Sequence, residues 1–182
     1  MGQENRPLVP SSTSVDDESV TERHISCQHM NKINKIYKEG AEVYLTNDLR
    51  ICTDGAPKGV IPDNNWQRTT AYGNHVQKQY LNALKVNYIV LPGDYNGKAR
   101  LGDRGVLIDE STGNIAHCIV GEVGPNGATF GEVSIAAVWD IGYPNHKSAN
   151  YGISGTFTVI VYPNSKIDLD WKQPIQRQIN GR

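Results

Sequence analysis

Short runs of β-branched and aromatic residues, separated by turn residues, recur along most of this 182-residue chain. Such runs favour β-strands, while Gly, Pro, Asn and Asp between them favour turns. The sequence contains at least seven strand-like segments, at 42–45, 49–52, 86–91, 105–109, 115–120, 133–141 and 156–162. This pattern predicts a mainly β domain whose strands surround one core.

Two of these segments carry a more detailed expectation. The first pair, 42–45 and 49–52, lies on either side of Asn47-Asp48, which predicts a β-hairpin. Segment 133–141 fits either a strand or a short helix ended by Gly142.

The N-terminal part of the chain differs from the rest. Residues 1–24 are rich in Ser, Thr, Pro, Asp and Glu, and they lack an apolar core after a basic start. This composition predicts a disordered tail rather than a signal peptide. Residues 27–39 place Met30, Ile33, Ile36 and Tyr37 at helical spacing before Gly40, which predicts a short helix packed on the domain. Residues 25–182 are then expected to form a single domain.

Charge and hydropathy bear on whether the chain binds nucleic acid or a membrane. The formal net charge is −1, with 20% charged and 38% hydrophobic residues, and no apolar run is long enough to span a bilayer. Loop 94–104 carries both charge signs but lacks the broad basic face with interleaved aromatics that nucleic-acid binding requires. We therefore expect a monomer without nucleic-acid or membrane partners.

The cysteines and histidines predict no metal site and no cofactor. The three cysteines, Cys27, Cys52 and Cys118, form no close pair, and the five histidines show no ligand spacing. The sequence leaves undecided whether Cys27 and Cys52 form a disulfide. His117 and Cys118 are neighbours on a predicted strand, so their side chains are expected on opposite faces rather than as a catalytic dyad.

Two carboxylates flank one turn in the stretch 119–142. Glu122 ends an apolar run, a Gly/Pro/Asn turn follows, and Glu132 begins the next apolar run. Because a turn brings its ends together, both acids can face one cleft, as glycoside hydrolysis requires. The apolar run after Glu132 would raise its pKa and favour proton donation. The alternative is that both residues are solvated loop acids.

The motifs around these acids resemble glycoside hydrolase family 75, the endo-chitosanases. That family has a strand ending in Gly-Asp, a short loop and then Gly-Glu-x-Ser-Ile-Ala. Here Gly121-Glu122 stands in place of Gly-Asp, and the second block is present from Gly131 to Ala136. Further matches, in the family's order between about 46 and 162, are Cys52-Thr53-Asp54-Gly55, Trp66-Gln67-x-x-Thr70-Ala71-Tyr72, Asn87-Tyr88-Ile89-Val90-Leu91-Pro92 and Leu101-Gly102-Asp103.

The resemblance implies a small double-psi-type β-barrel and an inverting endo-acting hydrolase of a β-1,4-linked amino-sugar polymer, chitosan. It carries the catalytic pair over to Glu122 and Glu132. We expect Glu132 to be the general acid and Glu122 the base, and the reverse assignment stays open. The residues expected to bind substrate are Asp54, Trp66, Tyr72 and Asp103. On sequence alone, Asp54 before Gly55 fits a turn cap equally well.

Three alternatives to a chitosanase remain. Peptidoglycan is also a β-1,4-linked amino-sugar polymer, so a cell-wall hydrolase acting as an antibacterial effector or lysis enzyme fits the same chemistry. A non-catalytic carbohydrate-binding barrel would follow if the longer arm of Glu122 misplaced the attacking water. An interaction domain that uses the N-terminal tail is the third. Without a predicted signal peptide, a secreted polysaccharide hydrolase is expected to act outside the cell or in the periplasm after export by a non-Sec route.

Overall fold

The computed structural model describes residues 39–181. The predicted N-terminal tail and the helix predicted before Gly40 lie outside the described residues.

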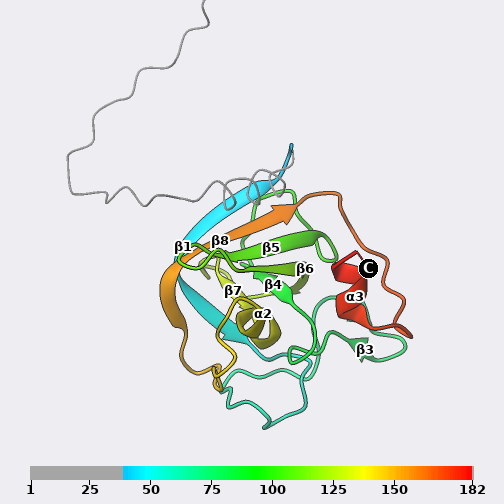
Figure 1. Cartoon of the computed structure of the whole chain (residues 1–182). Helices are drawn as coiled ribbons and strands as arrows, with labels where there is room; N and C mark the ends of the chain where they lie inside the picture. The colour runs from blue at the N-terminus through cyan, green and yellow to red at the C-terminus, as the bar shows by residue number, and fades with distance from the viewer. Residues whose placement is uncertain (1–38, 182) are drawn as a thin grey trace, which may run out of the picture.

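Six strands close into a barrel in the order β1-β7-β4-β6-β5-β8 (Figure 1). Neighbours β1–β7 and β4–β6 are parallel, and the other pairs are antiparallel. The strands are β1 (Glu42–Cys52), β4 (Tyr88–Leu91), β5 (Arg104–Asp109), β6 (Ile115–Val123), β7 (Glu132–Ser134) and β8 (Ile153–Tyr162). The prediction of a mainly β chain built around a small barrel is confirmed.

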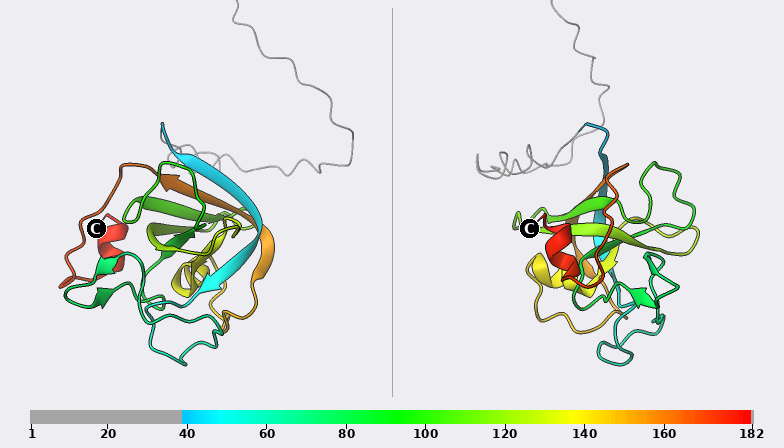
Figure 2. Two further views of the ribbon diagram at one scale, coloured as in Figure 1. Left: turned by 180° about the vertical axis from the view of Figure 1, so that it is seen from behind. Right: turned by 90° about the vertical axis from the view of Figure 1, so that its right-hand side faces the viewer.

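The remaining elements are short. A two-stranded sheet pairs β2 (Gly73–Asn74) with β3 (Gln79–Tyr80). Helix α2 (Ile135–Asp140) follows β7 directly, and helix α3 (Ile175–Ile179) lies near the C-terminus on the outside of the barrel (Figure 2). Gln176 ties α3 to the barrel because its Oε1 accepts from Asn87 N at 2.8 Å and its Nε2 donates to His117 O at 3.0 Å.

The barrel interior forms the main core. Its largest fully buried side chains include Tyr88, Ile89, Leu107, Ile119 and Phe157. On β5 the alternate residues Val106 and Ile108 belong to a second, smaller cluster with Ile160 of β8. Both faces of β5 are therefore buried, which explains why its sequence is an almost continuous apolar run.

The hairpin predicted at Asn47-Asp48 is wrong. These residues lie inside the single long strand β1, where the register against β8 shifts between Thr46 and Asp48. Both halves of β1 pair with the same neighbour, so the turn-like dipeptide makes a β-bulge rather than a reversal.

Segment 133–141 combines both of its predicted alternatives. Strand β7 ends at Ser134, which is the N-cap of α2 and accepts from Ala137 N at 3.4 Å. The same Ser134 Oγ accepts from Tyr88 N at 3.0 Å, which fixes the change from strand to helix against β4.

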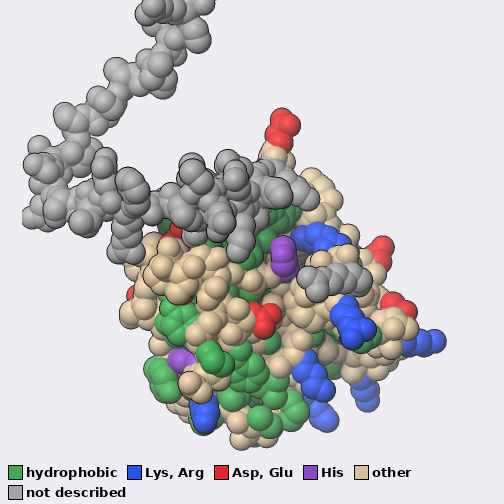
Figure 3. Space-filling model, in the orientation of Figure 1, with side chains coloured by type: hydrophobic (Ala, Val, Ile, Leu, Met, Phe, Trp, Pro, Cys, Tyr) green, Lys and Arg blue, Asp and Glu red, His purple; other side chains and the backbone are tan. Residues whose placement is uncertain are grey.

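The polar surface is unevenly charged. Figure 3 shows basic side chains gathered near α3 and β3, while acidic ones are scattered over this face. His117 is exposed and its neighbour Cys118 is buried, so the two side chains lie on opposite faces of β6, as expected for neighbours on a strand. Within residues 39–181, no helix has the length and apolar character needed to cross a membrane.

Candidate active site

The two predicted catalytic glutamates lie in one row across the barrel. Arg50 of β1 pairs with Glu132 of β7, and Val90 of β4 pairs with Glu122 of β6. Ile89 pairs with Val133, so continuing this antiparallel register by one residue places Val90 beside Glu132. The row is therefore Arg50, Glu132, Val90, Glu122, and all four residues line one cleft of about 810 Å³.

Strand β4 sets the distance between the acids. Since neighbouring strands lie about 4.8 Å apart, two strands separated by a third place the Cα atoms of Glu122 and Glu132 about 10 Å apart. Both side chains line the same cleft, and a Cβ at Gly124, two residues after Glu122, would lie 3.8 Å from Glu132 Oε2. A Cα separation of this size allows the two carboxyl groups to stand roughly 6.5–9.5 Å apart, which is the separation that an inverting pair requires.

A β-bulge aims Glu122 into the cleft. Ile89 pairs with Val120 but Val90 pairs with Glu122, so Gly121 is an extra residue in β6. Without it, Glu122 would move one position along the strand and point to the opposite face. Only glycine fits there, because a Cβ at Gly121 would lie 2.6 Å from Leu81 Cδ1 and 2.7 Å from Tyr88 Cβ.

The carboxylate of Glu122 is held by two backbone groups. Its Oε2 accepts from Ala71 N at 2.9 Å and its Oε1 accepts from Val123 N at 2.8 Å. Burial raises the pKa of Glu122, and the nearby Asp54 and Glu132 add to this, while the two N–H donors oppose it by stabilising the ionised form.

The environment of Glu132 is different. Burial raises the pKa of Glu132 most, and repulsion from Asp54 and Asp63 raises it further, while Arg50 and a hydrogen bond from the Cys52 side chain oppose the shift. Among the described residues, no backbone N–H donates to its carboxylate. Glu132 therefore has the stronger physical reason to remain protonated.

Asp54 is both a turn residue and a member of the cleft. It is only 6% exposed, its Oδ1 accepts from Gln67 N at 2.6 Å, and its backbone oxygen accepts from Tyr88 Oη at 3.1 Å. Burial raises its pKa, and the hydrogen bond from Gln67 opposes this shift. Gly55 completes the turn at φ +74°, where a Cβ would lie 1.8 Å from Leu81 O. The Asp54 carboxylate thus ties the turn to the segment at Gln67 and also lines the cleft, and substrate binding by Asp54 stays a prediction.

Three other residues expected to bind substrate do not line this cleft. The indole Nε1 of Trp66 donates to Ala56 O at 3.0 Å, and the Tyr72 hydroxyl donates to Ile167 O at 2.7 Å. Asp103 is buried, and its carboxylate accepts from two backbone N–H groups at 2.8 and 2.9 Å. These side chains support the fold, so we leave them out of the proposed site.

The cleft also contains residues that the sequence motifs did not indicate. Asp63 lines it, with Oδ2 accepting from Thr53 Oγ1 at 2.7 Å and Oδ1 accepting from Asn65 N at 2.8 Å. Tyr151 is 59% exposed at the rim and meets the ring of His146 edge-on at 4.9 Å. The only sequence signals for them were polar turns at 62–65 and 149–152.

The cleft is acidic. Its charged lining residues are four acids, Asp54, Asp63, Glu122 and Glu132, and one base, Arg50, which leaves a formal charge of −3 when all are ionised. Within residues 39–181, no three His, Cys, Asp or Glu side chains are grouped to hold a metal ion. The arrangement suits proton transfer to and from a bound substrate that carries positive charge.

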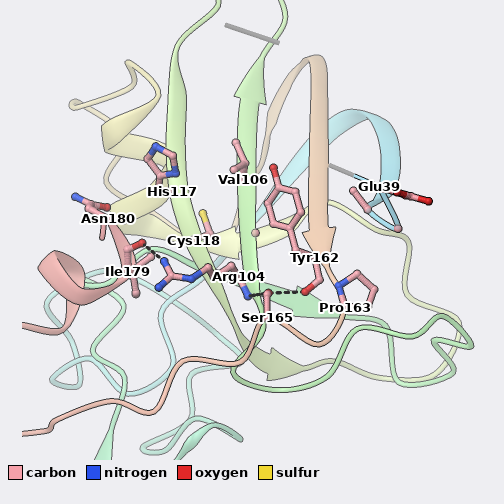
Figure 4. A pocket seen from close by; sticks show the side chains of 13 residues that line it. Glu39, Arg104, Val106, His117, Cys118, Tyr162, Pro163, Ser165, Ile179 and Asn180 are labelled. Atoms are coloured by element: carbon pink, nitrogen blue, oxygen red, sulfur yellow. Dashed lines mark hydrogen bonds between the residues drawn. The ribbon is translucent and has the colours of Figure 1, made fainter. Parts of the chain in front are cut away.

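A second concavity lies on the outer face of β5, β6 and β8 (Figure 4). It measures about 370 Å³, and its polar groups join the C-terminal segment to the barrel. Arg104 Nη1 donates to Ile179 O at 2.9 Å, and Arg104 N donates to Ser165 Oγ at 2.8 Å. Among the residues of 39–181 that line this concavity, Glu39 is the only acid, so they offer no pair of carboxyl groups.

Comparison with known proteins adds no relative. No protein-family model matches the chain, and no curated protein matches it. The geometry of the cleft is therefore the basis for the function proposed below.

Proposed function

We propose that this protein is an endo-acting, inverting glycoside hydrolase that cleaves a β-1,4-linked amino-sugar polymer, with chitosan as the substrate. The observation that carries the proposal is that Glu122 and Glu132 line one acidic cleft from two strands separated by β4. This separation leaves room for a water molecule between a carboxylate and the sugar.

The surroundings of the two glutamates favour one assignment of roles. Glu122 accepts two backbone hydrogen bonds, which stabilise its ionised form, so it serves as the general base. Glu132 is buried near Asp54 and Asp63, which favour its protonated form, so it serves as the general acid.

Cleavage then proceeds in one displacement. Glu132 donates its proton to the glycosidic oxygen while the bond from that oxygen to the anomeric carbon breaks. Glu122 removes a proton from a water molecule, and the water oxygen bonds to the anomeric carbon from the opposite face. The product has inverted configuration, and exchange with solvent restores both carboxyl groups.

The cleft lining suits a polymer with free amino groups. Asp54 and Asp63 place negative charge beside the acid pair, where the ammonium of a deacetylated sugar would be stabilised. Tyr151 offers an exposed ring at the rim, and an aromatic ring covers the apolar face of a sugar well.

The test is release of reducing ends from chitosan and from purified peptidoglycan. We compare the native protein with Glu132→Gln and Glu122→Gln, and use Asp94→Asn, an exposed acid outside the cleft, as the control. Loss of general acid catalysis should lower kcat by about 10²–10⁴-fold in Glu132→Gln. The anomer formed first, read by NMR, should be inverted.

Each other outcome selects a different function. Release from peptidoglycan alone would make the protein a cell-wall hydrolase. Polymer binding without release from either substrate would leave a non-catalytic binding barrel. Release that persists unchanged in both glutamate variants would remove them from the chemistry.

A further inference from the structure

A second hollow adjoins the end of the cleft that holds Glu132. It measures about 370 Å³ and lies between β1 and the loop before β7. Arg50 lines both this hollow and the cleft, and Gly131, which precedes Glu132, lines the hollow. The two concavities are therefore neighbours along the row of strands that carries the acids. We call this hollow, lined by 44–48, Arg50 and 129–131, the side pocket.

The side pocket is preformed. One wall is the stacked pair Tyr44 and Phe130, whose ring centroids lie 3.9 Å apart at an interplanar angle of 3°. Tyr95 meets both rings edge-on, and its hydroxyl donates to Glu42.

Close packing of the loop onto β1 forms the other wall. Gly131 has φ +124°, and a Cβ there would lie 2.9 Å from both Asp48 O and Thr46 Cγ2. The bulge in β1 between Thr46 and Asp48 thus fits directly against the loop that leads to Glu132.

The chemistry of the side pocket differs from that of the cleft. Its lining combines aromatic rings with the hydroxyl and amide groups of Thr46, Asn47 and Thr129. Its charged lining residues are one acid, Asp48, and one base, Arg50, and Asp48 Oδ1 already accepts from Ser154 Oγ at 2.9 Å. With Arg50 counted in both linings and all groups ionised, the formal charge of the described lining residues is zero in the side pocket and −3 in the cleft. It offers hydrogen bonds and an aromatic wall without surplus negative charge.

We infer that the side pocket is a distal sugar subsite that accepts an uncharged, N-acetylated unit of the polymer, next to a cleft that accepts deacetylated units. This inference rests on the proposed function. An ammonium group entering the side pocket would lose hydration and would meet one acid, Asp48, which already accepts from Ser154 and shares the lining with the cation Arg50, while an acetamido group would lose less hydration. Binding energy gained at such a subsite increases the rate of cleavage in long substrates.

The experiment must distinguish two roles for the side pocket: a subsite that binds sugar, or packing that only holds the loop before β7 in place. Phe130 lies two residues from Glu132, so a change there would disturb catalysis in either case. Thr129 is exposed and lines the side pocket, so Thr129→Trp fills the pocket from its rim. Val76→Trp is the matched control, because Val76 is 94% exposed and lies in the turn between β2 and β3, outside both concavities.

Two readouts decide the matter. The first is kcat/KM on partially acetylated polymer relative to kcat/KM on the shortest cleaved oligomer; we expect Thr129→Trp to lower this ratio about tenfold and Val76→Trp to leave it unchanged. The second is calorimetric binding of an N-acetylated oligomer to Glu132→Gln, which should weaken about tenfold when Thr129→Trp is added.

The outcomes separate this inference from the proposed function. No hydrolysis by the native protein, together with Thr129-dependent binding of the N-acetylated oligomer, would remove the hydrolase and keep the subsite. Hydrolysis with an unchanged ratio and unchanged binding in Thr129→Trp would overturn the subsite and keep the hydrolase. Equal or tighter binding of a fully deacetylated oligomer at the side pocket would overturn its preference for an uncharged unit.

Discussion

The two sides of the cleft hold the same side chain in different ways. On the β6 side, a bulge at Gly121 aims Glu122 and two backbone N–H groups hold its carboxylate. On the β7 side, Glu132 lies beside Asp54, and its ionised form is favoured by Arg50 and by a hydrogen bond from the Cys52 side chain rather than by backbone N–H groups. The comparison shows that identical carboxyl groups in one cleft have different environments, set by the hydrogen-bond donors and charges around them, and the proposed division into acid and base follows from this difference.

The largest expected difference between Glu132→Gln and Glu122→Gln is their activity on a substrate that needs no general acid. A glycosyl fluoride has a leaving group that departs without protonation. Glu132→Gln should therefore retain activity on an oligosaccharide fluoride while losing about 10²–10⁴-fold on the natural linkage. Glu122→Gln should lose activity on both, and fluoride release followed with an ion electrode checks this. A reversed pattern would exchange the two roles.

The bulge on the β6 side can be broken directly. Gly121→Ala places a methyl group 2.6 Å from Leu81 Cδ1, so we expect about 1–3 kcal/mol lower stability and loss of hydrolysis. Gly127→Ala is the control, since no atom lies within 4 Å of its added Cβ and only its positive φ opposes the change. Denaturant unfolding measures both. Full activity in Gly121→Ala would show that the bulge does not aim Glu122.

Removing Asp54 or Arg50, the two opposite charges beside Glu132, should move the pH profile of kcat/KM in opposite directions. With Glu132 as the acid, activity falls at high pH as its carboxyl group ionises. Asp54→Asn removes a repulsion that raises the pKa of Glu132, so the alkaline limb of kcat/KM should move to lower pH. Arg50→Gln removes an attraction that lowers this pKa, so the limb should move to higher pH. Shifts in the same direction would contradict the assignment.

The smallest effect concerns stability. The pKa of Glu132 is raised in the folded protein above its ordinary value of 4.5, so ionisation opposes folding. The stability that Glu132 contributes is complete below pH 4.5 and is lost as pH rises through the raised pKa. Glu132→Gln should therefore have a Tm a few degrees higher at neutral pH, and the difference should vanish near pH 4. Calorimetry at the two pH values tests this sign.

The sequence predicted the parts of the molecule that depend on short-range patterns. Runs of β-branched residues indicated most barrel strands, and the Gly-Glu pairs indicated two acids that do line one cleft. The hairpin at Asn47-Asp48 failed because turn residues also suit a bulge, and only the pairing of β1 with β8 distinguishes them.

The other walls of the cleft depend on contacts between distant segments. Asp63 and Tyr151 reach the cleft because loops 53–67 and 149–152 lie together, where Asn64 N donates to Asn150 Oδ1 and Ala149 N to Pro62 O, both at 2.8 Å. No local pattern encodes such a contact. Conversely, the sequence predicted that Trp66 and Asp103 bind substrate. In the structure their polar side-chain atoms form hydrogen bonds with nearby backbone groups instead.

The position of β4 between the two acids has a consequence for redesign. Because residues on neighbouring strands are separated by about 4.8 Å, the gap between two carboxylates on this barrel changes in steps of one strand. The exchange of aspartate for glutamate supplies a finer adjustment. A retaining hydrolase needs carboxyl groups about 5–5.5 Å apart, which corresponds to adjacent strands. On this scaffold, a carboxylate at position 90, beside Glu122, would therefore bring two carboxyl groups to the spacing of a retaining pair.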